Sequence, residues 1–264
     1  DEARLRARAG LSDLVSTDRL ESALAALAQS GRRVRVDLGG VRAAPAAPLA
    51  IGGWTPEREL AVALAARPDA IRVDDAHELF ARLRMIKSPR EIAAIQRAVD
   101  AAAESMLAAI QVVRPGITER ALMGTFESAC RTRGAQRFPF TPIVKSGPNA
   151  LWPWRILASH YDRRDRQLAE GDLVIFDVGC EIDYYVSDIG RSVPVGGRFN
   201  AAQRRAVRMV TEVSDSIIAA IRPGVTFGTL RAVAYRVIPD WARPFMQTGS
   251  FFGHHIGLES GDPS

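Results

Sequence analysis

The chain has 264 residues, of which 47% are hydrophobic and 25% charged, and this composition excludes a disordered or fibrous protein. The length favours one large domain, or a domain and a half. The net charge is +5, but the basic residues are scattered and form no stripe interleaved with aromatic residues, so we expect no nucleic-acid partner. No apolar run approaches the roughly 18 residues that a membrane span requires, so we expect no membrane insertion.

The chain contains two cysteines, Cys130 and Cys180. Two are too few for a disulfide framework, and their spacing is not that of a metal site. We therefore expect buried free thiols and, from them, a reducing, cytoplasmic compartment. Because the chain neither begins with Met nor finishes on a terminating element, we also expect a partial sequence.

Residues 1–80 alternate between helical and strand patterns. Helical spacing of apolar residues covers 20–28, and Thr55 followed by Pro56 is typical of a helix start, here over 55–66. Short apolar strands are expected at 34–38 and 71–73. This order predicts part of a small α/β domain, with His77 on a surface helix near its end.

A long helix is expected from Pro89 to about residue 112. Ser88 suits its N-cap, and Glu91 completes a capping box. The helix ends in Val-Arg-Pro-Gly-Ile-Thr at 113–118, and Ile-Arg-Pro-Gly-Val-Thr at 221–226 repeats this pattern in the same helical context. Pro-Gly ends one helix and Thr caps the next in both places, which favours a duplicated half-domain with a site between the halves.

Two aspartates flank an expected hairpin. The apolar residues 173–176 predict a buried strand that ends at Asp177, a turn follows at 180–183, and a second strand covers 184–195. In a hairpin centred between residues 182 and 183, Asp177 faces Asp188 with Cβ atoms roughly 5 Å apart. Such carboxylates repel each other unless a cation lies between them, as in dinuclear metal sites. Spacing alone leaves open a second interpretation, two solvated aspartates beside a turn.

The histidines add a candidate ligand. His254 and His255 lie in an apolar, Gly-flanked segment that we expect to form a strand, and His160 lies in a loop before the Asp177 strand. A histidine in such a strand is often a hydrogen-bonded core residue. Imidazole beside two carboxylates instead suits Mn, Co, Fe or Zn.

Four motifs in order resemble one family, the creatinase/aminopeptidase P/methionine aminopeptidase family. In chain order they are the Lys87-Ser88-Pro89-Arg90-Glu91-Ile92 helix start, the His160-Tyr161 pair, the Asp177-x-Gly179-(5)-Tyr185-x-x-Asp188-x-x-Arg191 hairpin and the Gly253-His254-His255-Ile256-Gly257-Leu258 segment. The resemblance favours His254 over His255 as a ligand. It is closest to Xaa-Pro aminopeptidase and prolidase.

The resemblance implies an α+β fold. We expect a pita-bread peptidase domain over 81–264, truncated at its C-terminus, with an antiparallel sheet flanked by helices around a pseudo-two-fold. Part of a creatinase-like α/β domain would precede it at 1–80. The implied cofactors are two divalent metal ions, manganese first and Co, Zn or Fe as alternatives. The implied partners are a peptide with proline at its second position and a second copy of the chain, in a homodimer.

The resemblance also assigns roles. Asp177 would bind one metal, Asp188 both and His254 the other, and the metals would activate a bridging water that attacks the scissile Xaa-Pro carbonyl. His160 would hydrogen-bond the substrate or the tetrahedral intermediate as a catalytic residue. Two neighbours are expected only to pack or support the site: Tyr185 and Arg191.

The chain departs from the family pattern in three ways. The two Glu ligands, one of them the general base, belong beyond His254, so we expect this fragment to be inactive. Ser250 and Gly261 stand where prolidase-like members usually carry histidines. Gly190 stands where Thr is common, which weakens the expected support for Asp188.

Two alternatives remain. One is a non-catalytic pita-bread module that binds peptides or proteins, and the other is a metal-free, creatinase-like hydrolase. The combination of Asp177, Asp188 and His254 argues against both, but Ser250 and Gly261, at positions where histidines are usual, keep the binding module open. A simple methionine aminopeptidase is disfavoured by the additional α/β segment.

Overall fold

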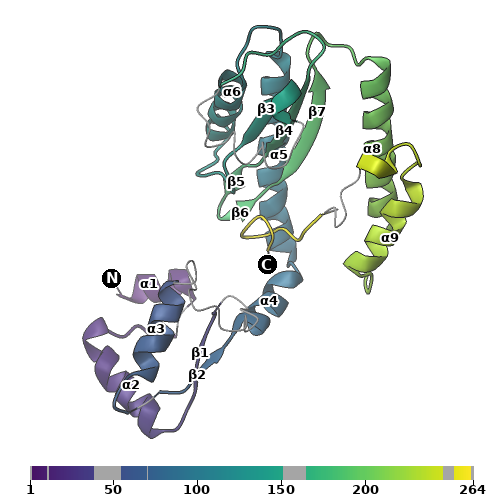
Figure 1. Ribbon diagram of the computed structural model, residues 1–264. Coiled ribbons are helices and arrows are strands. Elements are labelled where there is room, and N and C mark those ends of the chain that lie inside the picture. Colours follow the sequence, from purple (N-terminus) through teal and green to yellow (C-terminus); the bar gives the residue numbers. More distant parts are fainter. Residues whose placement is uncertain are drawn as a thin grey trace. The chain divides into compact units, whose positions relative to one another are not determined.

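The computed structural model describes residues 2–10, 12–38, 55–69, 71–150, 165–245 and 253–262. The chain divides into two compact units, residues 1–83 and 84–264, and each is considered by itself (Figure 1). That the first unit is part of a creatinase-like domain stays a prediction.

The first unit alternates helices and strands, as expected. Its elements are α1 (Glu2–Ala9), α2 (Leu20–Gln29), β1 (Val34–Val36), α3 (Pro56–Ala65), β2 (Val73–Asp75) and most of α4 (His77–Met85). β1 and β2 pair in parallel. The side chain of Thr55 accepts a hydrogen bond from the Arg58 N–H at 3.3 Å and caps α3. His77 begins a helix as predicted, but its ring is partly buried, with Nδ1 3.1 Å from Asp37 Oδ1.

In its described residues, the second unit combines a three-stranded antiparallel sheet and a two-stranded hairpin with two helix pairs. Its elements are α5 (Pro89–Gln111), α6 (Glu119–Thr132), β3 (Ile143–Ser146), β4 (Leu173–Val178), β5 (Glu181–Ile182), β6 (Tyr185–Val186), β7 (Ile189–Pro194), α8 (Ala201–Ala220) and α9 (Phe227–Val237). The sheet order is β3-β4-β7, and β5 and β6 form the tip of the hairpin that joins β4 to β7.

α5 and α6 cover one face of the sheet. α5 begins with the predicted capping box: the Ser88 side chain accepts from the Glu91 N–H, and the Glu91 carboxylate accepts from the Ser88 N–H. Beyond this cap, the apolar stripe of α5 packs with α6 on the alternate residues of β4. The buried residues of this core include Ala98, Ala102, Met106, Leu122, Phe126, Val174, Phe176 and Val178.

The repeated hexapeptide forms the same turn twice. Gly116 and Gly224 have φ of +85° and +86°, values that glycine adopts at little cost. Thr118 caps α6 and Thr226 caps α9, each through its side chain. The predicted helix–turn–helix repeat is therefore confirmed in the pairs α5–α6 and α8–α9.

The expectation of free thiols is wrong, because Cys130 and Cys180 form a disulfide. Both residues are fully buried, as expected. They are 50 residues apart in the chain, and the packing of α6 on the sheet brings their Cα atoms to 6.2 Å, within the usual disulfide range. The argument from free thiols to a reducing compartment therefore loses its basis.

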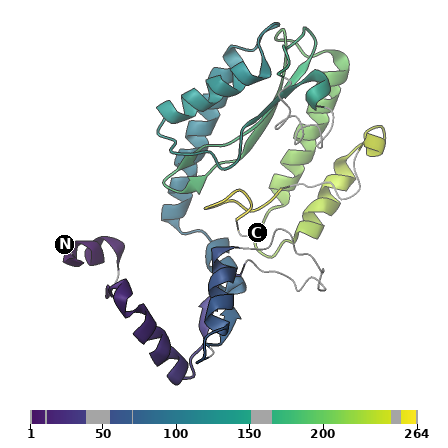
Figure 2. The same ribbon diagram turned by 60° about the vertical axis from the view of Figure 1, so that its left-hand side comes forward.

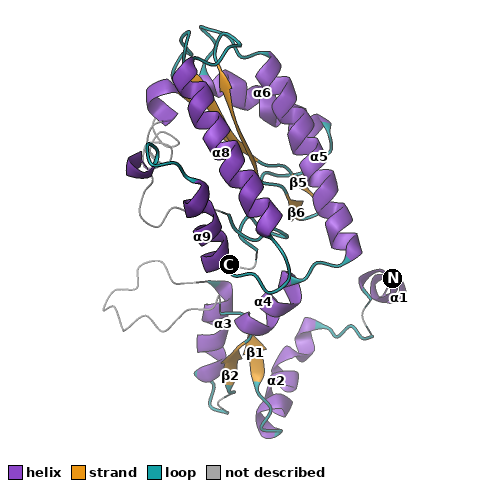
Figure 3. Ribbon diagram, turned by 90° about the vertical axis from the view of Figure 1, so that its right-hand side faces the viewer, coloured by secondary structure: helices purple, strands orange, loops and turns teal. Residues whose placement is uncertain are grey.

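The second face of the sheet is open toward α8. Figure 1 and Figure 2 both show the sheet between the α5–α6 pair and α8, and Figure 3 shows the same order from the side. A groove of about 770 Å³ lies between this face and α8, lined among others by Leu173, Ile175, Val207 and Val210. Within the described parts of the chain, no helix has the length and apolar character needed to cross a membrane.

Candidate metal centre

Strand β4 places Asp177 on the open face of the sheet. Side chains alternate along a strand, and Val174, Phe176 and Val178 are buried toward α5 and α6. Asp177 therefore shares its face with Ile175, which lines the groove. The core side of β4 fixes the strand, and the strand presents the carboxylate.

The predicted hairpin register is wrong by two residues. Asp177 pairs with Gly190, not with Asp188. The turn lies one residue later than expected, at Asp183 and Tyr184, which have φ of 52° and 69°. A centre shifted by one residue changes each cross-strand partner by two, so Asp188 stays on the same face as a diagonal neighbour of Asp177.

The two aspartates nevertheless interact directly. The pKa of Asp177 is raised to about 6, first because the carboxyl is partly buried and then because the Asp188 charge repels its ionised form. A hydrogen bond between the two carboxyl groups raises this pKa further, while the nearby His254 opposes the rise. Without a cation, the Asp177 carboxyl therefore retains its proton up to about pH 6.

His254 lies beside Asp188. Its Nε2 is 3.0 Å from Asp188 Oδ2, and the Ser260 hydroxyl donates a 2.9 Å hydrogen bond to the same oxygen. The structure brings Asp177, Asp188 and His254 to one cavity of about 420 Å³. The expected strand around His254 is not formed, since residues 253–255 are irregular.

The tautomer of His254 suits metal binding. Its Nδ1 is 2.7 Å from the His255 carbonyl oxygen, which accepts but never donates, so Nδ1 carries a proton. A divalent ion would therefore bind through Nε2, the ring atom that faces Asp188. Metal-binding histidines commonly donate their other N–H to a carbonyl or carboxylate in this way. His255 instead stacks edge-on against Phe227, at 5.4 Å between ring centroids.

These residues fit part of a divalent metal site. Two carboxylates and an imidazole nitrogen match the ligands of Mn, Fe, Co and Zn. However, no group of three or more His, Cys, Asp or Glu side chains in the described ranges is gathered tightly enough to hold an ion by itself. Asp188 contacts both partners, and His254 acts on Asp177 through its charge.

The other predicted site residues are located as follows. His160 and Ser250 lie outside the described residues. Gly261 has a φ of +106°, which disfavours any side chain there. Tyr185 donates a 3.1 Å hydrogen bond to Glu91, and Arg191 donates one to the Gly190 carbonyl oxygen. Both of these hydrogen bonds go to groups other than the two aspartates.

Sequence reasoning missed the residues that support the centre. Ser260 contacts Asp188, and Asp262 is buried at the end of the same loop. Both lie in a short polar segment without apolar periodicity, so no pattern indicated their role. The one available signal was their closeness in sequence to His254.

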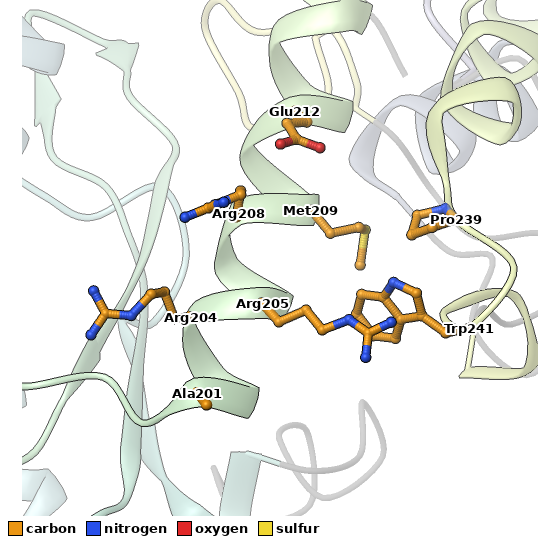
Figure 4. A pocket seen from close by; sticks show the side chains of 8 residues that line it. All are labelled: Ala201, Arg204, Arg205, Arg208, Met209, Glu212, Pro239 and Trp241. Carbon is orange, nitrogen blue, oxygen red and sulfur yellow. The ribbon is translucent and has the colours of Figure 1, made fainter.

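A second pocket is a poorer candidate. It has about 490 Å³ and lies between α8 and the turn after α9 (Figure 4). The Arg205 guanidinium stacks 4.1 Å above the Trp241 ring, whereas Arg204 and Arg208 point away from that pair. Because the three guanidinium groups do not converge on one point, they form no evident anion site.

Known proteins match most of this chain. Residues 93–264 match the model of a family described as Metallopeptidase family M24. The chain is 32% identical over 197 residues to Xaa-Pro aminopeptidase 3 of Mus musculus, covering 70% of this chain and 38% of that protein. It is 31% identical over 192 residues to the Xaa-Pro dipeptidase of Pyrococcus furiosus, covering 71% and 51%. The chain thus spans about half or less of these relatives.

The fold also matches a solved structure. The X-Pro aminopeptidase from Thermotoga maritima superposes with a TM-score of 0.71 at 23% identity, covering 96% of this chain and 66% of that one. This similarity confirms the expected α+β pita-bread fold. The family match covers all but the first turn of α5, the other helices of the second unit, the sheet and the candidate metal centre, and so the chain belongs to metallopeptidase family M24.

Proposed function

We propose that this chain carries part of the active centre of a metal-dependent peptidase that hydrolyses Xaa-Pro bonds. The observation that carries the proposal is the contact chain Asp177–Asp188–His254 at one cavity. The names of the relatives, Xaa-Pro aminopeptidase and Xaa-Pro dipeptidase, support the substrate class.

The residues present have distinct tasks. Asp177 and Asp188 would hold divalent cations between their carboxylates, and His254 would bind through Nε2 because its Nδ1 proton is committed to the His255 carbonyl. Divalent ions held there would supply an activated water and polarise the scissile carbonyl. Ser260 would orient Asp188 by donating to one of its oxygens.

Several finer points remain part of the proposal. Manganese is our preferred ion, a homodimer our preferred assembly, and His160 our candidate for contact with the substrate. The ligand set favours a metal enzyme over a metal-free creatinase-like hydrolase. A non-catalytic binding module has no need of two hydrogen-bonded, partly buried carboxylates.

Two measurements test this proposal. Calorimetric titration of the chain with Mn²⁺ should show binding that is lost in the His254→Ala variant and retained in His255→Ala, the matched control. The full-length gene product should release the N-terminal residue from an Xaa-Pro-Yaa peptide only when a divalent ion is present. Absence of metal binding together with absence of turnover would leave the binding module as the better explanation.

A further inference from the structure

The loop of residues 253–262 delivers two groups to one carboxylate oxygen. His254 Nε2 lies 3.0 Å and Ser260 Oγ 2.9 Å from Asp188 Oδ2. The loop contains no helix or ladder strand. Apart from a single bridge between Ile256 and Ser260, it is closed by short backbone bonds, including the Gly261 N–H to the His255 carbonyl at 3.0 Å. So few internal bonds do not by themselves fix where the loop lies.

Asp262 anchors the end of this loop. It is only 2% exposed, and its Oδ2 accepts a 2.7 Å hydrogen bond from the Leu258 N–H. Its Oδ1 is in ionic contact with Arg84 Nε at 2.6 Å, without an aligned hydrogen bond. Lys87 Nζ donates to the Asp262 carbonyl oxygen at 3.2 Å. A buried carboxylate is costly without such partners, so this arrangement restricts the loop strongly.

Gly257 completes the anchor. A Cβ there would lie 2.3 Å from Asp262 Oδ2 and 3.0 Å from Lys87 Cε, so the backbone approaches the anchor too closely for a side chain. The Gly257 carbonyl accepts a 3.0 Å hydrogen bond from the Val186 N–H. Val186 ends β6, two residues before Asp188. The anchor therefore fixes the loop to the strand that leads into the candidate ligand.

We propose that Asp262, held by Arg84 and Lys87, is a positioning residue of the metal centre. It acts through the loop, placing His254 and Ser260 against Asp188, and it touches no reacting group itself. The consequence for metal affinity rests on the proposed function. The consequence for loop geometry does not, because every contact involved lies within this chain.

The chain offers a matched pair of carboxylates for the test. Asp262 and Glu259 both contact Arg84, the latter at 3.5 Å, but the Glu259 side chain is 69% exposed. In the metal-free protein, Asp262→Asn should accelerate amide hydrogen exchange at Leu258 and Gly261 by about tenfold or more. Glu259→Gln should leave these rates unchanged. Equal exchange in Asp262→Asn and the parent protein would overturn the proposal.

Metal binding gives a second readout. Asp262→Asn should weaken Mn²⁺ binding by about tenfold or more, the usual effect of losing an outer support, and should change the visible spectrum of the Co²⁺-loaded protein. Mn²⁺ affinity and a Co²⁺ spectrum equal to those of the parent protein would refute the positioning role. If the parent protein bound no metal, the proposed function would fail, and amide exchange alone would still decide this inference.

A further pair of variants guards against simple misfolding. Arg84→Met should reproduce the faster exchange and weaker metal binding, because it removes the ion-pair partner of the Asp262 carboxylate. Arg84→Lys retains a positive charge and should restore both measurements toward those of the parent protein. Identical behaviour of the two Arg84 variants would contradict the role of the ion pair.

Discussion

Metal binding at the aspartate pair should depend steeply on pH. With a pKa of about 6, roughly one Asp177 carboxyl in eleven is ionised at pH 5, compared with nearly all at pH 7.5. A cation competes with that proton, so lowering the pH from 7.5 to 5 should weaken Mn²⁺ binding by about tenfold or more. Near pH 6, about half a proton should be released from Asp177 for each ion bound.

Calorimetry in two buffers with different ionisation enthalpies measures both the affinity and the proton release. The Asp183→Asn variant is a suitable control, since Asp183 is 60% exposed in the hairpin turn and lies outside the cavity. It should show the same pH profile as the parent protein. An affinity that stays constant from pH 7.5 to 5 would refute the assignment of Asp177 as a ligand with a raised pKa.

The same pKa fixes the sign of an effect on stability. Because the folded-state pKa of Asp177 lies above its ordinary value of 3.8, protonation stabilises the metal-free fold. This stabilisation is fully present below about pH 4 and is lost as the pH rises through about 6. Asp177→Asn resembles the protonated form, so at pH 7.5 it should raise the free energy of unfolding by about 1 kcal/mol, a value discounted for solvent screening. A less stable variant at pH 7.5 would contradict this reasoning.

Three further predictions concern thermal or chemical unfolding. Gly190→Ala should be neutral or should stabilise the fold by up to about 1 kcal/mol, because the added Cβ would meet nothing closer than 3.5 Å. By contrast, Gly179→Ala should destabilise the fold by more than about 2 kcal/mol, because the added Cβ would lie 1.9 Å from the Ser187 carbonyl oxygen. Glu119→Gln should lower the free energy of unfolding by about 1–3 kcal/mol, since this buried carboxylate accepts hydrogen bonds from both the backbone N–H and the hydroxyl of Ser146. Reduction of the Cys130–Cys180 disulfide, which closes a loop of 50 residues, should cost about 2–4 kcal/mol, and thiol titration of the unreduced, unfolded protein should find no free thiol.

The sequence predicted which face of the sheet carries the aspartates better than it predicted their pairing. Apolar alternation in β4 separates the core face from the open face, and this pattern depends only on local spacing. The register depends on the turn, and here a tyrosine, Tyr184, adopts a positive φ that tyrosine rarely occupies. No turn preference indicated that position. Because the error was an even number of residues, the predicted face survived it.

Contacts between distant segments were the least predictable. The disulfide forms because α6 packs on the sheet, and two cysteines without a motif spacing gave no sign of it. The anchor of the His254 loop joins Arg84 to Asp262, two residues that lie near opposite ends of this unit in the sequence. Such pairs follow from tertiary packing, whereas the caps at Ser88 and Thr118 follow from a few neighbouring residues and were predicted correctly.

The energetics of the aspartate pair bear on the choice between an enzyme and a binding module. The fold holds Asp177 in a position where its charge is unfavourable, against Asp188 and partly out of water. It fixes that position from two sides, through the core face of β4 and through the loop that brings His254 and Ser260 to Asp188. A module that needs only a stable fold gains nothing from this arrangement. If Asp177→Asn stabilises the metal-free protein and abolishes metal binding, the unfavourable position of the Asp177 charge is explained by its role in binding a cation.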